Sequence, residues 1–364
     1  MLTNNTSSQE DIGPNLTQVT ETGRKVLKYA VIGIVSYMVL SVVTRAFVSY
    51  WKAVNPPPPP PPTVGFGLLP TIEFPYEEAF DFPQEFEVSI PREKLNQFPD
   101  RAKIFEMPQA SLSLLADERA RKIARGYGFD AQPEMLGPKH YRWYKYQPLE
   151  FSFEIYLDNY NFSLLSDYQT RQELVSGVLP PEKHLAITTV KNYLSRAELL
   201  PADVATSPGE VRYLKSLAGQ LVEAVSLSDA SLIQVNINRV PVDEIYPMFT
   251  PRQNRAIVSS ILTNAVGGRN TIVQLTYDYH VVNYDRFETY PLKKVTEAIK
   301  ELEDGQAYVA SDEKIESTVV RDVLLGYFDN FDYQPFLQPI YVFSGDNGFV
   351  AYVSAIQKDF YFRE

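Results

Sequence analysis

Three histidines are the first residues to consider for chemistry, because the imidazole group serves proteins as a general base and as a metal ligand. His140, His184 and His280 are far apart in the chain, and none belongs to a His-Glu-x-x-His motif. His280 is the most suggestive of the three because Asp278 and Asp285 lie close to it in sequence. It falls opposite the apolar side of the strand expected around it, so we predict a solvent-facing histidine rather than a general base.

Clustered carboxylates form the second candidate group, since a cation site or an acid–base pair needs them at close range. One cluster contains Asp81, Glu85 and Glu87, and another contains Asp329 and Asp332. Either could hold a cation, but clustered acidic residues are more often part of a solvated face. We interpret both clusters in that way.

A short glycine-rich segment at residues 345–348, Gly-Asp-Asn-Gly, is similar to a fragment of a calcium-binding loop. It lacks the spaced carboxylates and the distal glutamate of such a loop, so we interpret it as a hairpin turn. The chain also has no phosphate-binding glycine loop, no Gly-x-Ser-x-Gly motif and no cysteine. The sequence therefore predicts no catalytic, cofactor-binding or metal-ligating residue, and a protein that is not an enzyme.

The composition limits the kinds of partner. The chain has 364 residues, a formal net charge of −11, 24 tyrosines and 21 phenylalanines. A strongly acidic chain is repelled by polyanions, which argues against a nucleic-acid partner. The high aromatic content is typical of twisted sheets with aromatic cross-strand pairs, and the length is sufficient for two or three small domains.

A long apolar stretch at residues 29–51 dominates the N-terminal part of the chain. Its only charged residue is Arg45. As a helix it would be roughly 34 Å long, enough to cross a hydrocarbon core of about 30 Å. Tyr29 lies at one end and Tyr50 and Trp51 lie at the other, as is typical of membrane interfaces. We predict a single transmembrane helix that anchors the chain in the lipid bilayer; a buried core helix and a cleaved signal peptide are the alternatives.

The flanks of this stretch indicate its orientation. Residues 1–28 are polar and rich in Asn, Thr and Ser, so we expect a disordered tail there. Arg24, Lys25 and Lys28 precede the stretch, whereas its far end carries only two basic residues. This small basic excess predicts a single-pass protein of the cell membrane with a cytoplasmic N-terminus and extracytoplasmic C-terminal domains.

Residues 52–102 have the composition of a linker. They contain seven consecutive prolines at 56–62, which favour a stiff polyproline II stalk, and then remain rich in Pro and Phe. A proline run could also bind an SH3-like domain, but this one has no flanking arginine. We expect a spacer that continues into an extended arm lying over a folded domain.

The rest of the chain alternates between helical and strand-like periodicity, which indicates an α+β fold with antiparallel sheets and packed helices. We place a first α+β unit at residues 103–200 and a C-terminal α+β unit at 201–364. Helices are expected at 113–125, 180–199, 207–225 and 290–302. Strands are expected at 141–146, 149–157, 232–239, 271–281, 307–309, 318–328, 339–343 and 349–356.

The helix expected at 290–302 has a clear apolar stripe. Its expected buried residues are Leu292, Val295, Ile299 and Leu302. Its expected solvent-facing residues are Lys293, Lys294, Lys300 and Glu301. We expect the helix to lie on a sheet formed by the strands at 271–281, 318–328, 339–343 and 349–356.

Two motifs near the C-terminus resemble a known family. One is the passage at 288–309, which begins Glu-Thr-Tyr-Pro-Leu-Lys-Lys-Val-Thr-Glu-Ala and ends Gly-Gln-Ala-Tyr-Val; the other comprises the apolar runs at 323–328, 337–343 and 349–356. Both are similar to parts of PepSY-like modules, which occur outside the membrane in anchored proteins such as the YycH/YycI regulators of a bacterial sensor kinase. The resemblance covers about residues 271–357. It implies an α+β module that binds or regulates other envelope proteins, and it carries over no catalytic residue.

These observations together predict a membrane-anchored, extracytoplasmic protein of the bacterial cell envelope that binds or regulates an envelope protein or peptide without catalysis. The alternative is an extracytoplasmic hydrolase that acts on cell wall or peptide through paired carboxylates, which would have to converge in one cleft. A purely structural spacer is a third possibility.

Overall fold

A computed structural model describes residues 16–54, 61–147, 149–175, 179–217, 219–266 and 270–362. The chain divides into two units, Met1–Pro61 and Pro62–Glu364. The described residues form seven α-helices and two sheets in which antiparallel pairs predominate. This confirms the predicted mixed α+β class.

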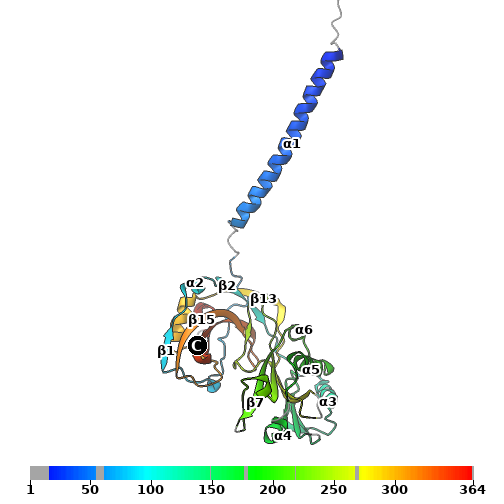
Figure 1. The fold of residues 1–364 in the computed structure, drawn as a ribbon, viewed down its shortest axis with the longest axis vertical. Helices are drawn as coiled ribbons and strands as arrows, with labels where there is room; N and C mark the ends of the chain where they lie inside the picture. Colours follow the sequence, from blue (N-terminus) through cyan, green and yellow to red (C-terminus); the bar gives the residue numbers. More distant parts are fainter. Residues whose placement is uncertain are drawn as a thin grey trace, which may run out of the picture. The chain divides into compact units, whose positions relative to one another are not determined.

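The first unit contains one long helix, α1 (Leu16–Val54), drawn in blue in Figure 1. It includes Gly23–Trp51, a 29-residue segment that is long and apolar enough to span a membrane. Its large apolar side chains, such as Val35 and Leu40, are exposed. Because a row of exposed apolar side chains is unfavourable in water, this helix is suited to a lipid environment.

Helix α1 begins before the expected span. Residues 16–28 are helical, although we expected a disordered tail throughout 1–28. Helix propagation explains the difference, because each residue added to an existing helix gains a backbone hydrogen bond, and this segment contains the good helix formers Leu, Glu, Arg and Lys. Residues 1–15 of the expected tail and 56–60 of the expected proline stalk lie outside the described residues.

The second unit holds the remaining elements. Its α-helices are α2 (Arg92–Leu95), α3 (Ala116–Gly126), α4 (Gln172–Val175), α5 (Lys183–Arg196), α6 (Ala202–Ala205) and α7 (Val295–Glu303). Its strands are β1 (Glu85–Val88), β2 (Arg101–Glu106), β3 (Glu134–Gly137), β4 (His140–Lys145), β5 (Phe151–Tyr156), β6 (Phe162–Ser166), β7 (Glu210–Leu217), β8 (Gln220–Glu223), β9 (Leu232–Ile237), β10 (Met248–Phe249), β11 (Val258–Thr263), β12 (Thr271–Tyr277), β13 (Asn283–Pro291), β14 (Tyr308–Val309), β15 (Ser317–Phe328), β16 (Phe336–Gly345) and β17 (Val350–Ser354).

A nine-stranded sheet forms one half of this unit, with the order β3-β4-β5-β6-β12-β11-β9-β7-β8 and antiparallel pairing throughout. Apolar side chains alternate along β5 and β9, which places one side of each strand in a core. Helices α3 and α5 bury Ile123 and Leu194 in this same core, together with Phe153 and Val235. Both helices therefore cover the sheet, and Figure 1 shows them in this half of the unit.

An eight-stranded sheet forms the other half. Its main path is β1-β15-β16-β17-β14; β10 joins β15, and β2 joins both β13 and β16. Strands β16 and β17 form the hairpin that the sequence predicts around residues 344–348. Helix α7 packs Val295, Ala298 and Leu302 into the core on one face of the sheet. Buried aromatic side chains, including Tyr308 and Tyr352, form a separate core on the sheet.

The chain between Pro62 and β1 is an extended arm that completes the eight-stranded half. Phe74 stacks on Tyr308, with ring centroids 5.2 Å apart, and meets the edge of Phe328 at 4.8 Å. The backbone of Leu69 forms a parallel bridge with Tyr361, near the other end of the chain. The arm thus supplies part of the core that the sheet lacks.

The structure does not divide at residue 200, where the sequence suggested a boundary. The nine-stranded sheet combines β3–β6 with β7–β9, β11 and β12, so it draws strands from both expected units. Strand β12 was expected beside the C-terminal strands, yet it pairs with β6 and β11. Strand pairing between distant segments leaves no local trace in the sequence, and this explains the error.

The segment 207–225 forms strands β7 and β8 instead of the expected helix. Gly209, at the expected helix start, has a φ of 69°, and Gly219 has a φ of 83° between the two strands. Positive φ angles are incompatible with a continuing helix and favour turns. The Val and Tyr residues of β7 also prefer strands, and pairing with β9 gives them a partner.

Helix α7 begins at Val295, five residues later than expected, because Tyr290 and Pro291 end strand β13 and pair with β2. Leu292, Val295 and Leu302 are buried as predicted, and Ile299 is partly buried. Lys293 was expected to face water, but it is only 5% exposed. It precedes the helix, and its Nζ lies 2.8 Å from Glu301 Oε2. Burial lowers the pKa of Lys293, and Glu301 opposes that shift.

Candidate functional site

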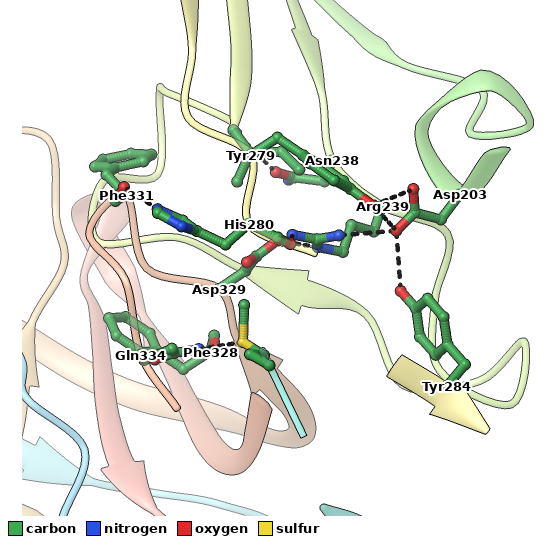
Figure 2. Close-up of polar contacts among 12 residues, drawn as sticks. Asp203, Asn238, Arg239, Tyr279, His280, Tyr284, Phe328, Asp329, Phe331 and Gln334 are labelled. Carbon is green, nitrogen blue, oxygen red and sulfur yellow. Dashed lines mark hydrogen bonds and ion pairs between the residues drawn. The ribbon is translucent and has the colours of Figure 1, made fainter. Parts of the chain in front are cut away.

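A buried guanidinium, that of Arg239, is the centre of the most elaborate polar cluster in the described chain (Figure 2). Arg239 follows strand β9, and its side chain is 0% exposed. Its Nη1 lies 2.8 Å from Asp203 Oδ2, and its Nε lies 2.7 Å from Asp329 Oδ2. Because an unpaired buried charge is very costly, these two carboxylates are what allows the arginine to be buried.

The three charged residues come from different parts of the fold. Asp203 lies in α6 and Arg239 follows β9 of the nine-stranded sheet, whereas Asp329 follows β15 of the eight-stranded sheet. Arg239 also donates a hydrogen bond to the carbonyl of His280, and its guanidinium lies 4.2 Å from the ring centroid of Tyr279. We call these residues the Arg239 cluster. It connects the two sheets through charge-assisted hydrogen bonds.

Two phenols complete the surroundings of Asp203. Tyr279 and Tyr284 each direct a hydroxyl to the carboxylate, at 3.2 Å in both cases. Burial raises the pKa of Tyr279 to about 12, and the charge of Arg239 opposes that shift. Both the guanidinium and this hydroxyl therefore donate to Asp203 at neutral pH.

A pocket of about 570 Å³ opens beside Asp203, with walls that include Phe105, Tyr284 and Phe287. Its charged side chains already have partners. Asp203 binds Arg239, and Lys103 Nζ lies 2.7 Å from Asp243 Oδ1. Asp203 and Asp329 are the kind of converging carboxylate pair that hydrolysis would need, but here one guanidinium binds both of them.

His280 is buried, contrary to the prediction of a solvent-facing histidine. It is 7% exposed, and its Nε2 lies 3.0 Å from the carbonyl oxygen of Phe331 and 3.5 Å from Asn161 Nδ2. Strand β12 ends at Tyr277, so the alternation that we extended to residue 280 no longer applies there. As Figure 2 shows, the imidazole points toward Phe331, while the backbone carbonyl of His280 accepts a hydrogen bond from Arg239.

The acidic neighbours of His280 differ from each other. Asp278 forms an ion pair with Arg255, and burial raises the pKa of its carboxyl while Arg255 opposes the shift. Asp285 is exposed. Neither is hydrogen-bonded to the imidazole in any contact of the described residues.

The other two histidines lie on separate elements. His140, in β4, has its Nε2 3.0 Å from Glu154 Oε2 and stacks on Tyr156 with ring centroids 4.4 Å apart. His184 is exposed in the first turn of α5. Among the residues that the structure describes, no group of three or more His, Cys, Asp or Glu side chains could hold a metal ion.

The two acidic clusters have different outcomes. Glu85 and Glu87 lie on β1 and are exposed, and Asp81 is exposed on the arm, as expected for a solvated face. Asp332 is exposed as well, but Asp329 is 0% exposed, so the interpretation as a solvated face was wrong for this residue. The available signal was its position directly after the buried end of β15, where a single charge needs a partner.

The segment at 345–348 forms the turn between β16 and β17, as predicted. Arg321 Nη2 lies 2.8 Å from Asp346 Oδ2, and Arg321 Nε donates to Oδ1 at the same distance. This hydrogen-bonded pair lowers the pKa of the Asp346 carboxyl. Both oxygens of the one carboxylate in the turn are thus bound by the guanidinium.

A second pocket, of about 410 Å³, lies under α5 in the nine-stranded half. Six of its twelve lining residues are aromatic or aliphatic and the other six are polar or basic; we call it the aromatic pocket after its tyrosines and phenylalanines. Sequence reasoning missed it because its lining comes from α5, β4, β5, β6, β12 and the segment after α3. No single stretch of sequence carries a motif for such a site.

Comparisons with known proteins identify no family for the chain. No family model and no curated protein matches it. Among solved structures, the crystal structure of an uncharacterized protein from Eubacterium rectale ATCC 33656 is similar over 73% of this chain and 86% of that one, with 10% sequence identity and a TM-score of 0.34. A likeness of this size supports no conclusion about fold or function.

Proposed function

We propose that this protein is a single-pass, membrane-anchored binding or regulatory protein of the bacterial cell envelope, and that it is not an enzyme. The observation that carries the proposal is helix α1, whose segment Gly23–Trp51 is long and apolar enough to span a bilayer. A chain that combines such a helix with a compact α+β unit is suited to presenting that unit at a membrane surface.

The orientation proposed here follows the basic residues. Arg24, Lys25 and Lys28 would remain on the cytoplasmic side, and the unit Pro62–Glu364 would be outside, with the proline run as a stalk between them. The resemblance to PepSY-like modules supports an extracytoplasmic location. Since β12 belongs to the nine-stranded sheet, the proposed module now comprises β13, α7 and β14–β17.

The binding role rests on two of the pockets of the second unit. The aromatic pocket and the pocket beside Asp203 have volumes of about 410 and 570 Å³. Cavities of roughly 300–1,000 Å³ are typical of sites for small molecules and short segments of chain. The pockets differ in charge, because the charged side chains around Asp203 are already paired.

The experiment uses the full chain in bacterial cells whose outer layers have been removed. Protease added outside should digest the unit Pro62–Glu364, and a cross-linker applied before lysis should join it to an envelope component. Full protection from protease would contradict the proposed orientation. A digested chain without any cross-linked species would contradict the binding role while leaving the anchor intact.

A further inference from the structure

One part of the aromatic pocket is lined by buried apolar side chains. Phe129, Phe151 and Leu164 line it and are themselves at most 8% exposed. Tyr127 and Tyr193 form one wall as a stacked pair, with ring centroids 3.9 Å apart and planes at 10°. The Tyr127 hydroxyl donates to the carbonyl of Tyr193 at 3.2 Å, which fixes this wall. A preformed apolar cavity of this kind favours an apolar or aromatic group as its occupant.

Two cations line the same pocket, Lys145 from the end of β4 and Arg196 from the end of α5. Within the described chain neither forms an ion pair, and the nearest aromatic contact of Lys145 is the Phe129 ring at 6.0 Å. By contrast, Arg142 and Arg212 each bind carboxylates. None of the described residues lining the pocket is acidic. In a chain of net charge −11, this local positive potential selects an anionic ligand.

Polar groups on α5 add hydrogen-bonding capacity. The Tyr193 hydroxyl and the Asn192 amide line the pocket and have no hydrogen-bond partner among the described residues. Burial raises the pKa of Tyr193, so its hydroxyl stays protonated and can donate. A fatty acid would leave such groups unpaired beside its hydrocarbon chain, whereas a peptide backbone offers donors and acceptors to them.

We propose that the aromatic pocket binds the free carboxyl terminus of a peptide whose last side chains are apolar or aromatic. The terminal carboxylate pairs with Arg196 and Lys145, the last side chain enters the aromatic interior, and the backbone bonds to Asn192 and Tyr193. This inference rests on the proposed binding function and names the class of ligand. Arginine suits the role because its planar guanidinium can bind both oxygens of a carboxylate.

The test measures fluorescence anisotropy of a dye-labelled Gly-Ser-Gly-Ser-Leu-Phe peptide with the full chain in detergent micelles. We expect the free acid to bind, and its C-terminal amide to bind at least about tenfold more weakly, because a hydrogen bond to a charged group is lost. Arg196→Gln should weaken binding of the acid by about tenfold, and Lys145→Gln by a similar or smaller factor. Lys183→Gln, at an exposed position on the same helix, is the matched control and should bind as the native chain does.

Several results would overturn the proposal. Equal affinity for the acid and the amide would show that the pocket does not bind the terminal carboxylate. Equal effects of Arg196→Gln and Lys183→Gln would show the same. Displacement of the peptide by palmitate at lower concentration than by unlabelled peptide would make the occupant a lipid acid. Arg196→Lys retains the charge but not the planar fork, so it should bind the acid more tightly than Arg196→Gln and more weakly than the native chain. Cross-linking to an envelope component that persists in Arg196→Gln, with no binding of the peptide acid, would reject this pocket while the proposed function stands.

Discussion

The Arg239 cluster and the aromatic pocket both contain basic side chains, but among the described residues these side chains are paired with carboxylates only in the cluster. Arg239 is fully buried with two carboxylates against it, and its neighbours supply further hydrogen bonds. Lys145 and Arg196 line an open pocket and lack carboxylate partners in the described chain. A buried charge whose hydrogen-bonding groups are already bound by carboxylates is not available to bind a ligand. We infer that the Arg239 cluster stabilises the fold, whereas the cations of the aromatic pocket are available to bind a ligand.

Removal of the Arg239 guanidinium should have the largest effect. In Arg239→Met, Asp203 and Asp329 lose their shared cation inside the fold, and we expect a loss of about 3–5 kcal/mol in the free energy of unfolding. Chemical denaturation of the full chain in detergent measures it. Arg321→Met removes an exposed pair with Asp346, which solvent screens, and should cost far less. Similar losses in the two variants would mean that the cluster does not hold the sheets together.

Truncation of a buried apolar side chain gives a reference for the loss of stability expected in Arg239→Met. Leu302 is 0% exposed in the core under α7, so Leu302→Ala should cost about 2–5 kcal/mol through lost burial and the cavity left behind. Lys300, on the exposed side of the same helix, should change stability by no more than about 0.5 kcal/mol when replaced by Ala. Thermal unfolding of both variants checks the amphipathic assignment. Equal shifts would refute it.

Alkaline titration distinguishes the cluster from the surface. The pKa of Tyr279 is raised to about 12 in the fold from an ordinary value near 10, so the folded state retains its proton longer than the unfolded state. Its contribution to stability is complete below pH 10 and is lost as the pH rises from 10 to 12. Tyr279→Phe should therefore flatten the decline of stability over this range, by up to about 2 kcal/mol. The exposed Tyr146→Phe should leave the decline unchanged.

The pocket variants should have the smallest effect on stability. Because Lys145 and Arg196 have no carboxylate to leave behind in the described chain, Arg196→Gln and Lys145→Gln should each change the free energy of unfolding by no more than about 0.5 kcal/mol. The same denaturation assay applies. A loss of several kcal/mol would show that these cations are structural, and the contrast with Arg239 would disappear.

Much of the local structure could be predicted, because the spacing of apolar residues along a single helix or strand matches the side of that element that is buried. Ile233, Val235 and Ile237 alternate along β9, and all three are fully buried. Val190 and Leu194 recur at helical spacing and form the buried side of α5. In each case the regularly spaced apolar residues form one face of the element, and that face is the one buried in the core.

The errors concern residues whose environment is made by distant parts of the chain. Asp329, His280 and Lys293 were all expected in water, and all three are buried. Asp329 and His280 contact partners remote in sequence. Lys293 pairs with the nearby Glu301, but its carbonyl also accepts a hydrogen bond from the distant Tyr341 hydroxyl. A single polar residue at the end of an apolar run looks the same whether the chain next reaches solvent or a second sheet. The helix expected at 207–225 failed in a related way, since its apolar residues also fit the strand that β9 pairs with.

Neither candidate site could be read from the sequence. The Arg239 cluster joins residues from α6, the end of β9 and the end of β15, and Asp203 was not among the residues we had considered. The aromatic pocket is lined by side chains from at least five elements. Both depend on the order of strands in the sheets, which periodicity alone does not specify.

The arm at the start of the second unit has a consequence for how the protein is made. Gln338 donates a hydrogen bond to the carbonyl of Pro70, 268 residues away in sequence, and Leu69 bridges to Tyr361. A growing chain therefore exposes the arm long before the ribosome has produced the strands that receive it. Contacts of such long range close late and slowly. A premature stop before Tyr361 would therefore also remove a contact from the beginning of the folded unit, whose own sequence would be intact.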